Sequence, residues 1–227
     1  MKERHLKVRR LGRFAYEDGL NLQKELETEV IAERENDYLC LLEHPHTFTL
    51  GRRAKMDGVL ATKDLLESLG VSVFETNRGG KVTYHGIGQI VGYPIISLSP
   101  DRKDVHRYVR DIEEVLIRTL ADFDIEAFRL EGLTGVHTKS GKVAAIGVHI
   151  KRWVTTHGFA LNVNTDLSYY NWIIACEGET VASMNEILGR ELELKEVEDK
   201  IIKNFADVFG IKDVSEENYA KAETVTV

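Results

Sequence analysis

The chain has 227 residues, of which 43% are hydrophobic and 8% aromatic, and these values suit one globular domain with a substantial core. Its formal net charge of −7 argues against a general nucleic-acid binder, whose affinity needs clustered positive charge. No apolar run approaches the ~20 residues that cross a bilayer, so we expect no membrane segment.

Two cysteines, Cys40 and Cys176, are present, and neither belongs to a CxxC pair or to a His/Cys cluster with zinc spacing. We therefore expect neither a disulfide framework nor a metal site. Sparse cysteine fits a reducing compartment. The basic N-terminal stretch lacks the serines of a transit peptide, and a cytoplasmic enzyme is predicted.

In the first half of the chain, apolar side chains at helical spacing predict an α-helix over residues 16–32. Thr62 is placed to cap a short helix that ends at Gly70. Strands are expected over residues 37–44, 44–53 and 71–76.

The second half begins with a glycine-rich segment over residues 77–98 and a long helix over residues 104–121. Strand-like segments follow over residues 124–130, 133–139, 142–150 and 158–163, and shorter helices over 181–188 and 195–209. This order predicts an α/β fold with a mixed, largely antiparallel sheet and flanking helices. We expect one domain over residues 1–227, with about 15 loosely ordered residues at its C-terminal end.

The segment RGGKVTYHGIGQ (residues 78–89) contains four glycines. Glycine allows the backbone to approach a ligand closely, but the same composition also fits a tight hairpin. Familiar phosphate motifs fail, because GIGQIVG and GVHTKSGKV each depart from the required glycine spacing by one residue. A serine hydrolase is also disfavoured, since the chain has no GxSxG nucleophile elbow.

Two side chains are candidates for nucleophilic catalysis. Cys40 lies among leucines and is expected to be a buried, inert thiol. Cys176 instead follows an aromatic stretch, and a thiol becomes a strong nucleophile when a nearby base or cation stabilises its thiolate. Lys142 is a candidate for that base, and His85 and His157 are further candidates. From these residues alone, a structural cysteine and a surface lysine remain open.

Three long motifs occur in the chain in the order EHPHTFTLGRRA, RGGKVTYHGIGQIVGYPIISL and GKVAAIGVHIKRWVTTHGFALNV, followed by DL and AC. Together they resemble the lipoyl(octanoyl) transferase family over approximately residues 8–188. The resemblance implies a fold like the catalytic core of biotin and lipoate protein ligases. It also implies that octanoyl is transferred from octanoyl-acyl carrier protein to a lysine of a lipoyl domain, without a cofactor or metal. The implied acceptors are lipoyl domains of 2-oxoacid dehydrogenase complexes and the glycine cleavage H protein.

Carried over residue by residue, the resemblance makes Cys176 the residue that forms the acyl thioester and Lys142 the residue that lowers its pKa. The positions that align with substrate-binding segments are Arg78, Gly79, Gly80, Lys81, Val82, Thr83, Tyr84, His85, Ala145, Ile146, Gly147, Gly158, Phe159 and Ala160. Beside the nucleophile the chain departs from the family pattern, with Ala175 in place of proline and Glu177 in place of glycine. Ile87 likewise stands where proline is common.

Other functions remain to be separated from this one. An ATP-dependent lipoate or biotin protein ligase on the same fold is the main alternative, and it needs no cysteine. A non-catalytic paralogue that only binds carrier domains needs neither Lys142 nor Cys176. A papain-like hydrolase with His157 or His85 as base is disfavoured because no papain-type signature surrounds Cys176.

Overall fold

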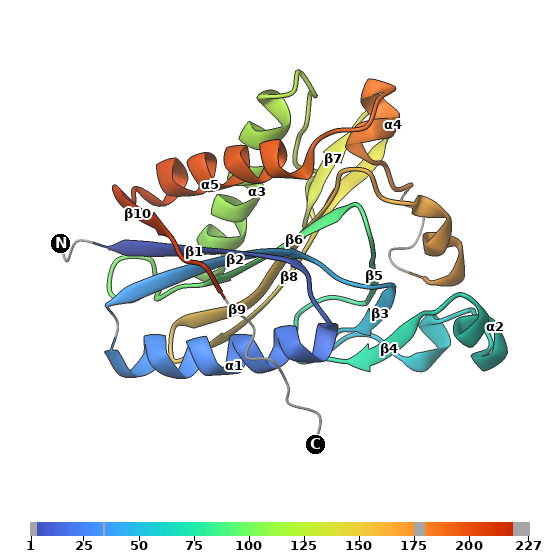
Figure 1. Ribbon diagram of the computed structural model, residues 1–227, viewed down its shortest axis with the longest axis horizontal. Helices are drawn as coiled ribbons and strands as arrows, with labels where there is room; N and C mark the ends of the chain where they lie inside the picture. Colours follow the sequence, from blue (N-terminus) through green and yellow to red (C-terminus); the bar gives the residue numbers. More distant parts are fainter. Residues whose placement is uncertain (1–3, 34, 175–179, 220–227) are drawn as a thin grey trace.

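A seven-stranded mixed sheet forms the centre of the computed structural model, which describes residues 4–33, 35–174 and 180–219 (Figure 1). The strand order is β10-β1-β2-β6-β9-β8-β7. The strands are β1 (His5–Arg13), β2 (Asn36–Glu43), β6 (Gln89–Ile95), β7 (Val136–Thr138), β8 (Gly141–Lys151), β9 (Val154–Asn162) and β10 (Asp213–Glu216). The β1 strand pairs in parallel with β10 and β2, whereas the other neighbours are antiparallel, which confirms the expected mixed, largely antiparallel sheet.

Helices cover both faces of this sheet. Helix α1 (Tyr16–Glu33) lies on one face, and α3 (Val105–Ala121) and α5 (Leu194–Phe209) lie together on the other (Figure 1). The apolar stripe of α3 continues into the larger core cluster through residues such as Ile112 and Leu116. Leu26 of α1 belongs to the smaller cluster on the opposite face. Within the described ranges, no helix is both long and apolar enough to cross a membrane.

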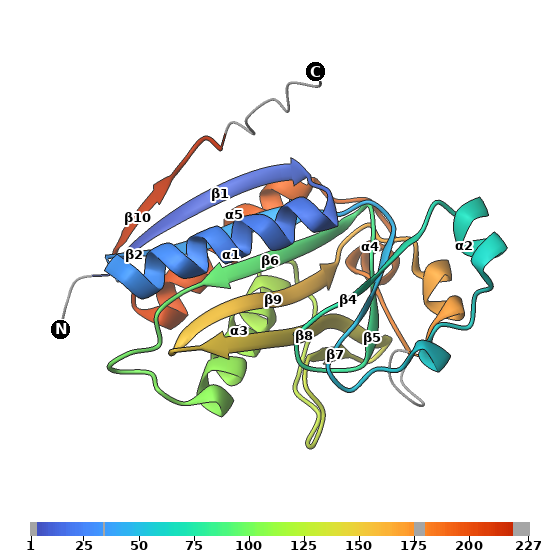
Figure 2. The same cartoon turned by 90° about the horizontal axis from the view of Figure 1, so that it is seen from below.

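A smaller three-stranded sheet stands at one end of the main sheet (Figure 2). It has the order β4-β3-β5, and it packs with short helices around an apolar cluster of its own. Its elements are β3 (Thr47–Leu50), η1 (Met56–Gly58), α2 (Lys63–Ser68), β4 (Ser72–Glu75), β5 (Val82–His85) and η2 (Leu167–Trp172). One further short helix, α4 (Met184–Leu188), follows residues 175–179 in the chain.

The helices expected from the sequence are confirmed. Tyr16–Glu33 and Val105–Ala121 match the predicted ranges, and the Leu65 N–H donates to the side-chain oxygen of Thr62, which caps α2 as expected. The strand expected over residues 124–130 is wrong. Only Phe128 forms an isolated bridge, to His137, and the side chain of Phe128 is partly exposed rather than covered by a second layer.

The β1 strand had no counterpart among the expected elements, because its basic side chains hide an alternating pattern. Leu6 and Val8 are buried in the core, while Arg9 and Arg10, on opposite faces of the strand, bind acidic residues. Those acidic partners lie near the C-terminal end of the described chain, about two hundred residues away. Pairing with β10 therefore depends on a contact that local sequence does not reveal.

Candidate active site

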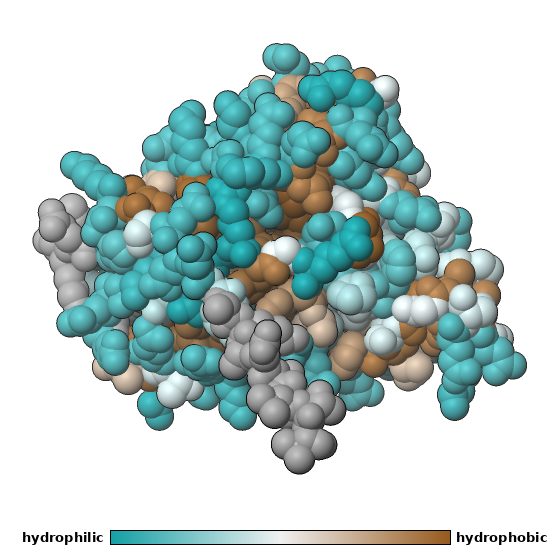
Figure 3. Space-filling model, viewed as in Figure 1, coloured by the Kyte–Doolittle hydropathy of each residue, from teal (hydrophilic) through white to brown (hydrophobic). Residues whose placement is uncertain are grey.

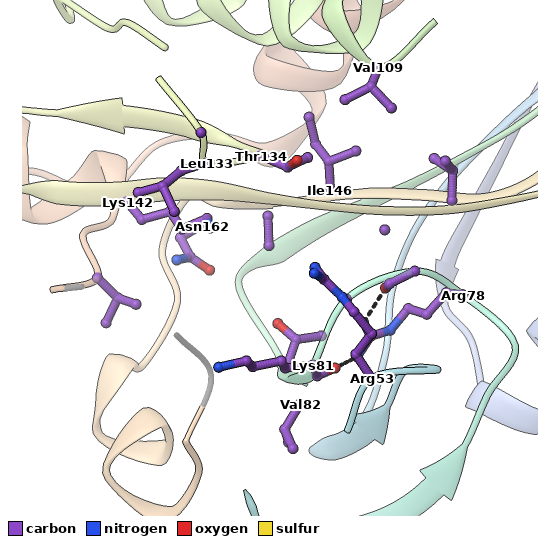
Figure 4. A pocket seen from close by; sticks show the side chains of 18 of the residues that line it. Arg53, Arg78, Lys81, Val82, Val109, Leu133, Thr134, Lys142, Ile146 and Asn162 are labelled. Atoms are coloured by element: carbon purple, nitrogen blue, oxygen red, sulfur yellow. Dashed lines mark hydrogen bonds between the residues drawn. The ribbon is translucent and has the colours of Figure 1, made fainter. Parts of the chain in front are cut away.

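A cavity of about 710 Å³ follows the outer edge of β8 (Figure 4). Strand β7 pairs with β8 only as far as Ala144, and beyond that point the edge is contacted by the loop of residues 78–81, here called the glycine loop. The Gly79 N–H donates to the carbonyl oxygen of Val148 at 3.0 Å. The glycine loop, β8, the start of α3 and the loop before β7 thus enclose the cavity.

Lys142 lines one end of the cavity, beside Asn162 (Figure 4). Its backbone N–H donates to the Thr180 oxygen at 2.9 Å, and its carbonyl oxygen accepts from the Ala182 N–H at 2.9 Å. Val181, between them, also lines the cavity. The chain that follows residues 175–179 is therefore fixed against the lysine by a parallel bridge.

Gly135 makes room for the Lys142 side chain. A Cβ atom at Gly135 would lie 2.7 Å from Cε of Lys142 and 3.4 Å from its Nζ, so no larger residue fits without displacement. Gly135 also has φ of 125°, a conformation that L side chains rarely adopt. The glycine therefore fixes the space in which the lysine side chain lies.

Glu113 of α3 holds Gly135 in place. Its side chain is buried, and Oε1 accepts from the Gly135 N–H at 3.1 Å. Its other oxygen accepts from Arg110 Nη1 at 2.7 Å and from Arg129 Nε at 3.1 Å. One buried carboxylate thereby joins the helix to the loop that contacts Lys142. Sequence reasoning missed Glu113, because its contact with Gly135 spans 22 residues.

Cys176, the predicted nucleophile, lies outside the described residues, as do Ala175 and Glu177. What the structure places are the residues on either side. Before residues 175–179, the Ile174 N–H donates to the Gly58 oxygen at 2.7 Å. After them, the chain pairs with Lys142 as described above.

Arg78 organises the glycine loop from within. Its buried guanidinium donates to Thr49, to Gly79 O at 2.9 Å and to Lys81 O at 2.9 Å. Burial lowers the pKa of Arg78, and among the described residues no carboxylate pairs with it. The loop curls around this cation, and Gly147 of β8 lets it approach, since a Cβ there would lie 2.9 Å from Gly79 O.

The remaining predicted segments meet on β8 and β9. Ala145, Ile146 and Gly147 pair with residues 158–160, which the family resemblance also implied as substrate-binding residues. Together with Arg78 of the glycine loop they line a second cavity of about 50 Å³ next to the first. The ring of Phe159 packs directly on Gly92, where a Cβ would overlap it. The two cavities share Ala145, Ile146 and Gly147 as lining residues and are therefore adjacent.

Two predicted binding residues, Tyr84 and His85, do not line the main cavity. Tyr84 is buried in the small cluster, with its ring stacked on Tyr169 at 4.9 Å between ring centroids. His85 reaches the second cavity, and its Nδ1 donates to Gln89 Oε1 at 2.9 Å. Gln89 in turn donates to Asn162 Oδ1 at 2.9 Å, which connects the histidine to the Lys142 end of the main cavity.

Neither candidate histidine has the basicity that a general base near neutral pH requires. Burial lowers the pKa of His85 well below its ordinary value, and the nearby His44 and Arg78 lower it further. Burial also lowers the pKa of His157 to about 4. Such groups accept protons weakly, which disfavours them as bases relative to Lys142. Within the described ranges, no cluster of three or more His, Cys, Asp or Glu residues is arranged to hold a metal ion.

Several lining residues were missed or misplaced by sequence reasoning. Val105 and Val109 share the helical apolar spacing of the buried Ile112 and Leu116, which favours a place in the core, but both line the cavity, and Val105 is exposed. Leu133 and Thr134 lie in an expected strand that begins only at Val136, and they form the opposite wall. No local signal distinguishes these apolar residues from core.

The chain is similar in sequence to proteins of one family. The model of the lipoyl protein ligase A/B catalytic domain matches residues 15–206. The octanoyltransferase of Solibacter usitatus is 47% identical over 205 residues, which cover 90% of this chain and 93% of that protein. The octanoyltransferase of Caldicellulosiruptor saccharolyticus is 46% identical over 211 residues, which cover 91% of this chain and 90% of that protein.

Solved structures share the fold at lower identity. A lipoate-protein ligase A bound with ATP superposes with a TM-score of 0.75 and 17% identity, over 96% of this chain and 90% of that one. A biotin protein ligase from Aquifex aeolicus with biotin and ATP gives a TM-score of 0.51 and 12% identity, over 92% and 71%. These likenesses confirm the expected biotin and lipoate ligase-like fold.

Proposed function

The chain belongs to the lipoyl protein ligase A/B catalytic domain family and is an octanoyltransferase, and from that premise we propose that the octanoyl group passes through a thioester on Cys176. The donor is octanoyl-acyl carrier protein and the acceptor is a lysine of a lipoyl domain. One observation carries the proposal: Lys142 lines the cavity, and its backbone is hydrogen-bonded to Thr180 and Ala182, which follow the segment that contains Cys176.

In the first half-reaction, the Lys142 amine takes the proton of the Cys176 thiol. The thiolate attacks the carbonyl carbon of the carrier thioester, and the tetrahedral intermediate then expels the carrier thiolate. The Lys142 ammonium returns the proton to this leaving thiolate. One thioester is made as another is broken, so the step needs no ATP.

In the second half-reaction, the amine of the acceptor lysine attacks the acyl-Cys176 carbonyl. Lys142 takes a proton from that amine, and the Cys176 thiolate is expelled and regains its proton. An amide replaces a thioester, which makes this step favourable. The same base therefore serves both halves, and the first carrier leaves before the second arrives.

The cavity walls suit an unbranched acyl chain. Val105, Val109, Leu133 and Ile146 supply apolar surface to the cavity of about 710 Å³. Each methylene that the chain buries contributes about 0.8 kcal/mol, and the six methylenes of the octanoyl group together contribute about 5 kcal/mol. The apolar wall thus supplies binding energy without any charged partner for the chain.

A choice of substrates distinguishes octanoyl transfer from the ATP-dependent reaction of a ligase. The protein is mixed with a lipoyl domain and given either octanoyl-acyl carrier protein without ATP, or free octanoate with ATP. We expect octanoylated lipoyl domain from the first mixture. Product from the second mixture alone would show an acyl-adenylate ligase instead. We expect the reaction to take place in the cytoplasm.

A further inference from the structure

Exposed apolar side chains gather beside the mouth of the cavity, on short helices and loops that pack with the small three-stranded sheet. Met56 is 57% exposed and Leu60 54% exposed, and Trp172 and Ile174 are exposed in part. Figure 3 shows apolar surface interspersed with hydrophilic side chains at the right-hand end of the molecule, where Figure 1 places α2. Single exposed apolar residues are ordinary, but an apolar group around a pocket mouth indicates an interaction surface.

These side chains stand on one connected piece of backbone. The Leu60 N–H donates to the Trp172 oxygen at 2.8 Å, and Val59 forms an antiparallel bridge with Ile173. Below them, Gly58 packs on Val82, which lines the cavity. The exposed residues are therefore held in fixed positions relative to the cavity.

Basic residues surround this apolar group. Arg52, Arg53 and Lys55 are exposed, and within the described part of the chain no acidic residue forms an ion pair with any of them. Asp57 is the acidic residue between them and Leu60. Such local positive charge contrasts with the formal net charge of −7 of the whole chain.

The basic residues are joined to the cavity wall. The Arg52 N–H donates to the Arg78 oxygen at 2.9 Å, and the Arg53 N–H donates to the Gly80 oxygen at 3.1 Å. Arg53 itself lines the cavity. We name as the docking surface Arg52, Arg53, Lys55, Met56, Leu60 and Trp172.

We infer that the docking surface binds the negatively charged carrier protein that brings the octanoyl thioester, an inference that rests on the proposed function. Its basic residues attract the acidic carrier, and its apolar residues supply contact area at the centre. The arm of the carrier then reaches past Arg53 into the cavity. The occupant is the donor, because the donor carries its acyl group on a long prosthetic arm.

The acceptor has a much shorter reach. A lysine side chain extends roughly 6 Å from its Cα, through bonds of about 1.5 Å. Its domain must therefore stand over the mouth itself, whereas Arg52, Lys55, Met56 and Leu60 lie beside the mouth. A surface at this position fits a partner with a long arm better than one with a short arm.

Across the mouth, a second apolar group offers less positive charge. Leu130 and Leu133 are exposed there, but the neighbouring Arg129 is already bound by Glu113 and Glu114. Its guanidinium is therefore less available to an acidic partner. Electrostatic complementarity favours the docking surface on the small sheet for the donor.

The test compares two octanoyl donors in the first half-reaction, followed by intact-mass measurement of the acylated protein. One donor is octanoyl-acyl carrier protein, and the other is the octanoyl thioester of N-acetylcysteamine, which needs no docking. The variants are Arg52→Glu with Lys55→Glu, and Met56→Ser with Leu60→Ser. The matched control is Lys24→Glu with Lys203→Glu, which makes the same charge change at exposed positions on α1 and α5.

We expect both docking variants to lower kcat/KM for the carrier donor by about tenfold at low ionic strength, and the control to leave it unchanged. The small thioester should react equally well with all four proteins. Added salt should slow the carrier reaction of the wild-type protein and have little effect on that of the charge-reversal variant.

Three results would overturn the inference. They are an unchanged carrier reaction in both docking variants, an equal loss with both donors, and a loss confined to transfer from the preformed acyl-enzyme to a lipoyl domain. The last result would assign the surface to the acceptor. A wild-type protein that gains no octanoyl group from either donor would instead contradict the proposed function.

Discussion

Glu113→Ala removes the carboxylate that fixes Gly135 against the side chain of Lys142. The Gly135 N–H loses a buried acceptor at 3.1 Å, and Arg110 and Arg129 lose their partner. An unsatisfied buried N–H costs about 1–3 kcal/mol. The ion pairs add little, because both arginines are partly exposed. We expect the free energy of unfolding to fall by about 1–3 kcal/mol, out of a total of about 5–15 kcal/mol for a domain.

The folded fraction of the variant should also acylate more slowly. When Gly135 is released, the space around Cε and Nζ of Lys142 is no longer fixed, and misplacing a catalytic group by about 1 Å can cost on the order of 10²-fold. Glu113→Gln retains an oxygen for the Gly135 N–H, and it should recover most of the lost rate. The matched control is Glu114→Ala, which removes ion pairs to Arg118 and Arg129 without touching Gly135.

Urea unfolding gives the stability of each variant, and single-turnover acylation measured at a temperature where all are folded gives the rate. The contact is refuted as a positioning device if Glu113→Ala loses stability yet acylates at the wild-type rate. Equal rates for the alanine and glutamine variants would also contradict it, because only the glutamine retains the acceptor.

Three other predictions follow from the same contacts. Lys142→Ala should slow acylation by about 10²- to 10⁴-fold with little change in the urea midpoint, and a rate within threefold of wild type would exclude this lysine as the base. Burial lowers the pKa of His44 and of His157 to about 4. The unfolded chain therefore takes up more protons than the folded chain as pH falls from 6.5, and the free energy of unfolding should decrease towards pH 4 by up to ~3 kcal/mol per histidine. A free energy of unfolding that does not change with pH over this range would contradict these pKa values. Arg78→Lys replaces a guanidinium that donates to Thr49 and to two loop carbonyl oxygens with a single ammonium group, so the melting temperature should fall by several degrees. An unchanged melting temperature would argue that Arg78 does not organise the loop.

Local sequence predicted the elements that have strong periodicity or a clear cap. Helices α1 and α3 follow from their apolar spacing, and the start of α2 follows from Thr62. Strand β10 (Asp213–Glu216) is polar and exposed, so it carries no such pattern, and it forms only because β1 offers an edge. Residues 124–130 are rich in strand formers but lack a second layer to cover them.

The parts of the candidate site that lie within the sequence motifs could be predicted from the sequence. The glycine loop, the middle of β8 and the facing part of β9 meet around the cavities, as the family resemblance implied. What the sequence did not reveal are contacts between distant segments. Glu113 on a helix reaches Gly135 on a loop, and Gly135 lies against Lys142, only through the fold. Val105 resembles an ordinary core residue in sequence, but it is exposed and lines the cavity.

Acylation of Cys176 tests the proposed route most directly. The protein is mixed with octanoyl-acyl carrier protein, its intact mass is measured, and the modified residue is located by peptide mapping. The proposed route predicts a single octanoyl adduct on Cys176 that hydroxylamine removes and that is absent from Cys176→Ser. An adduct on the buried Cys40, or no adduct under conditions in which a lipoyl domain becomes octanoylated, would contradict the thioester mechanism.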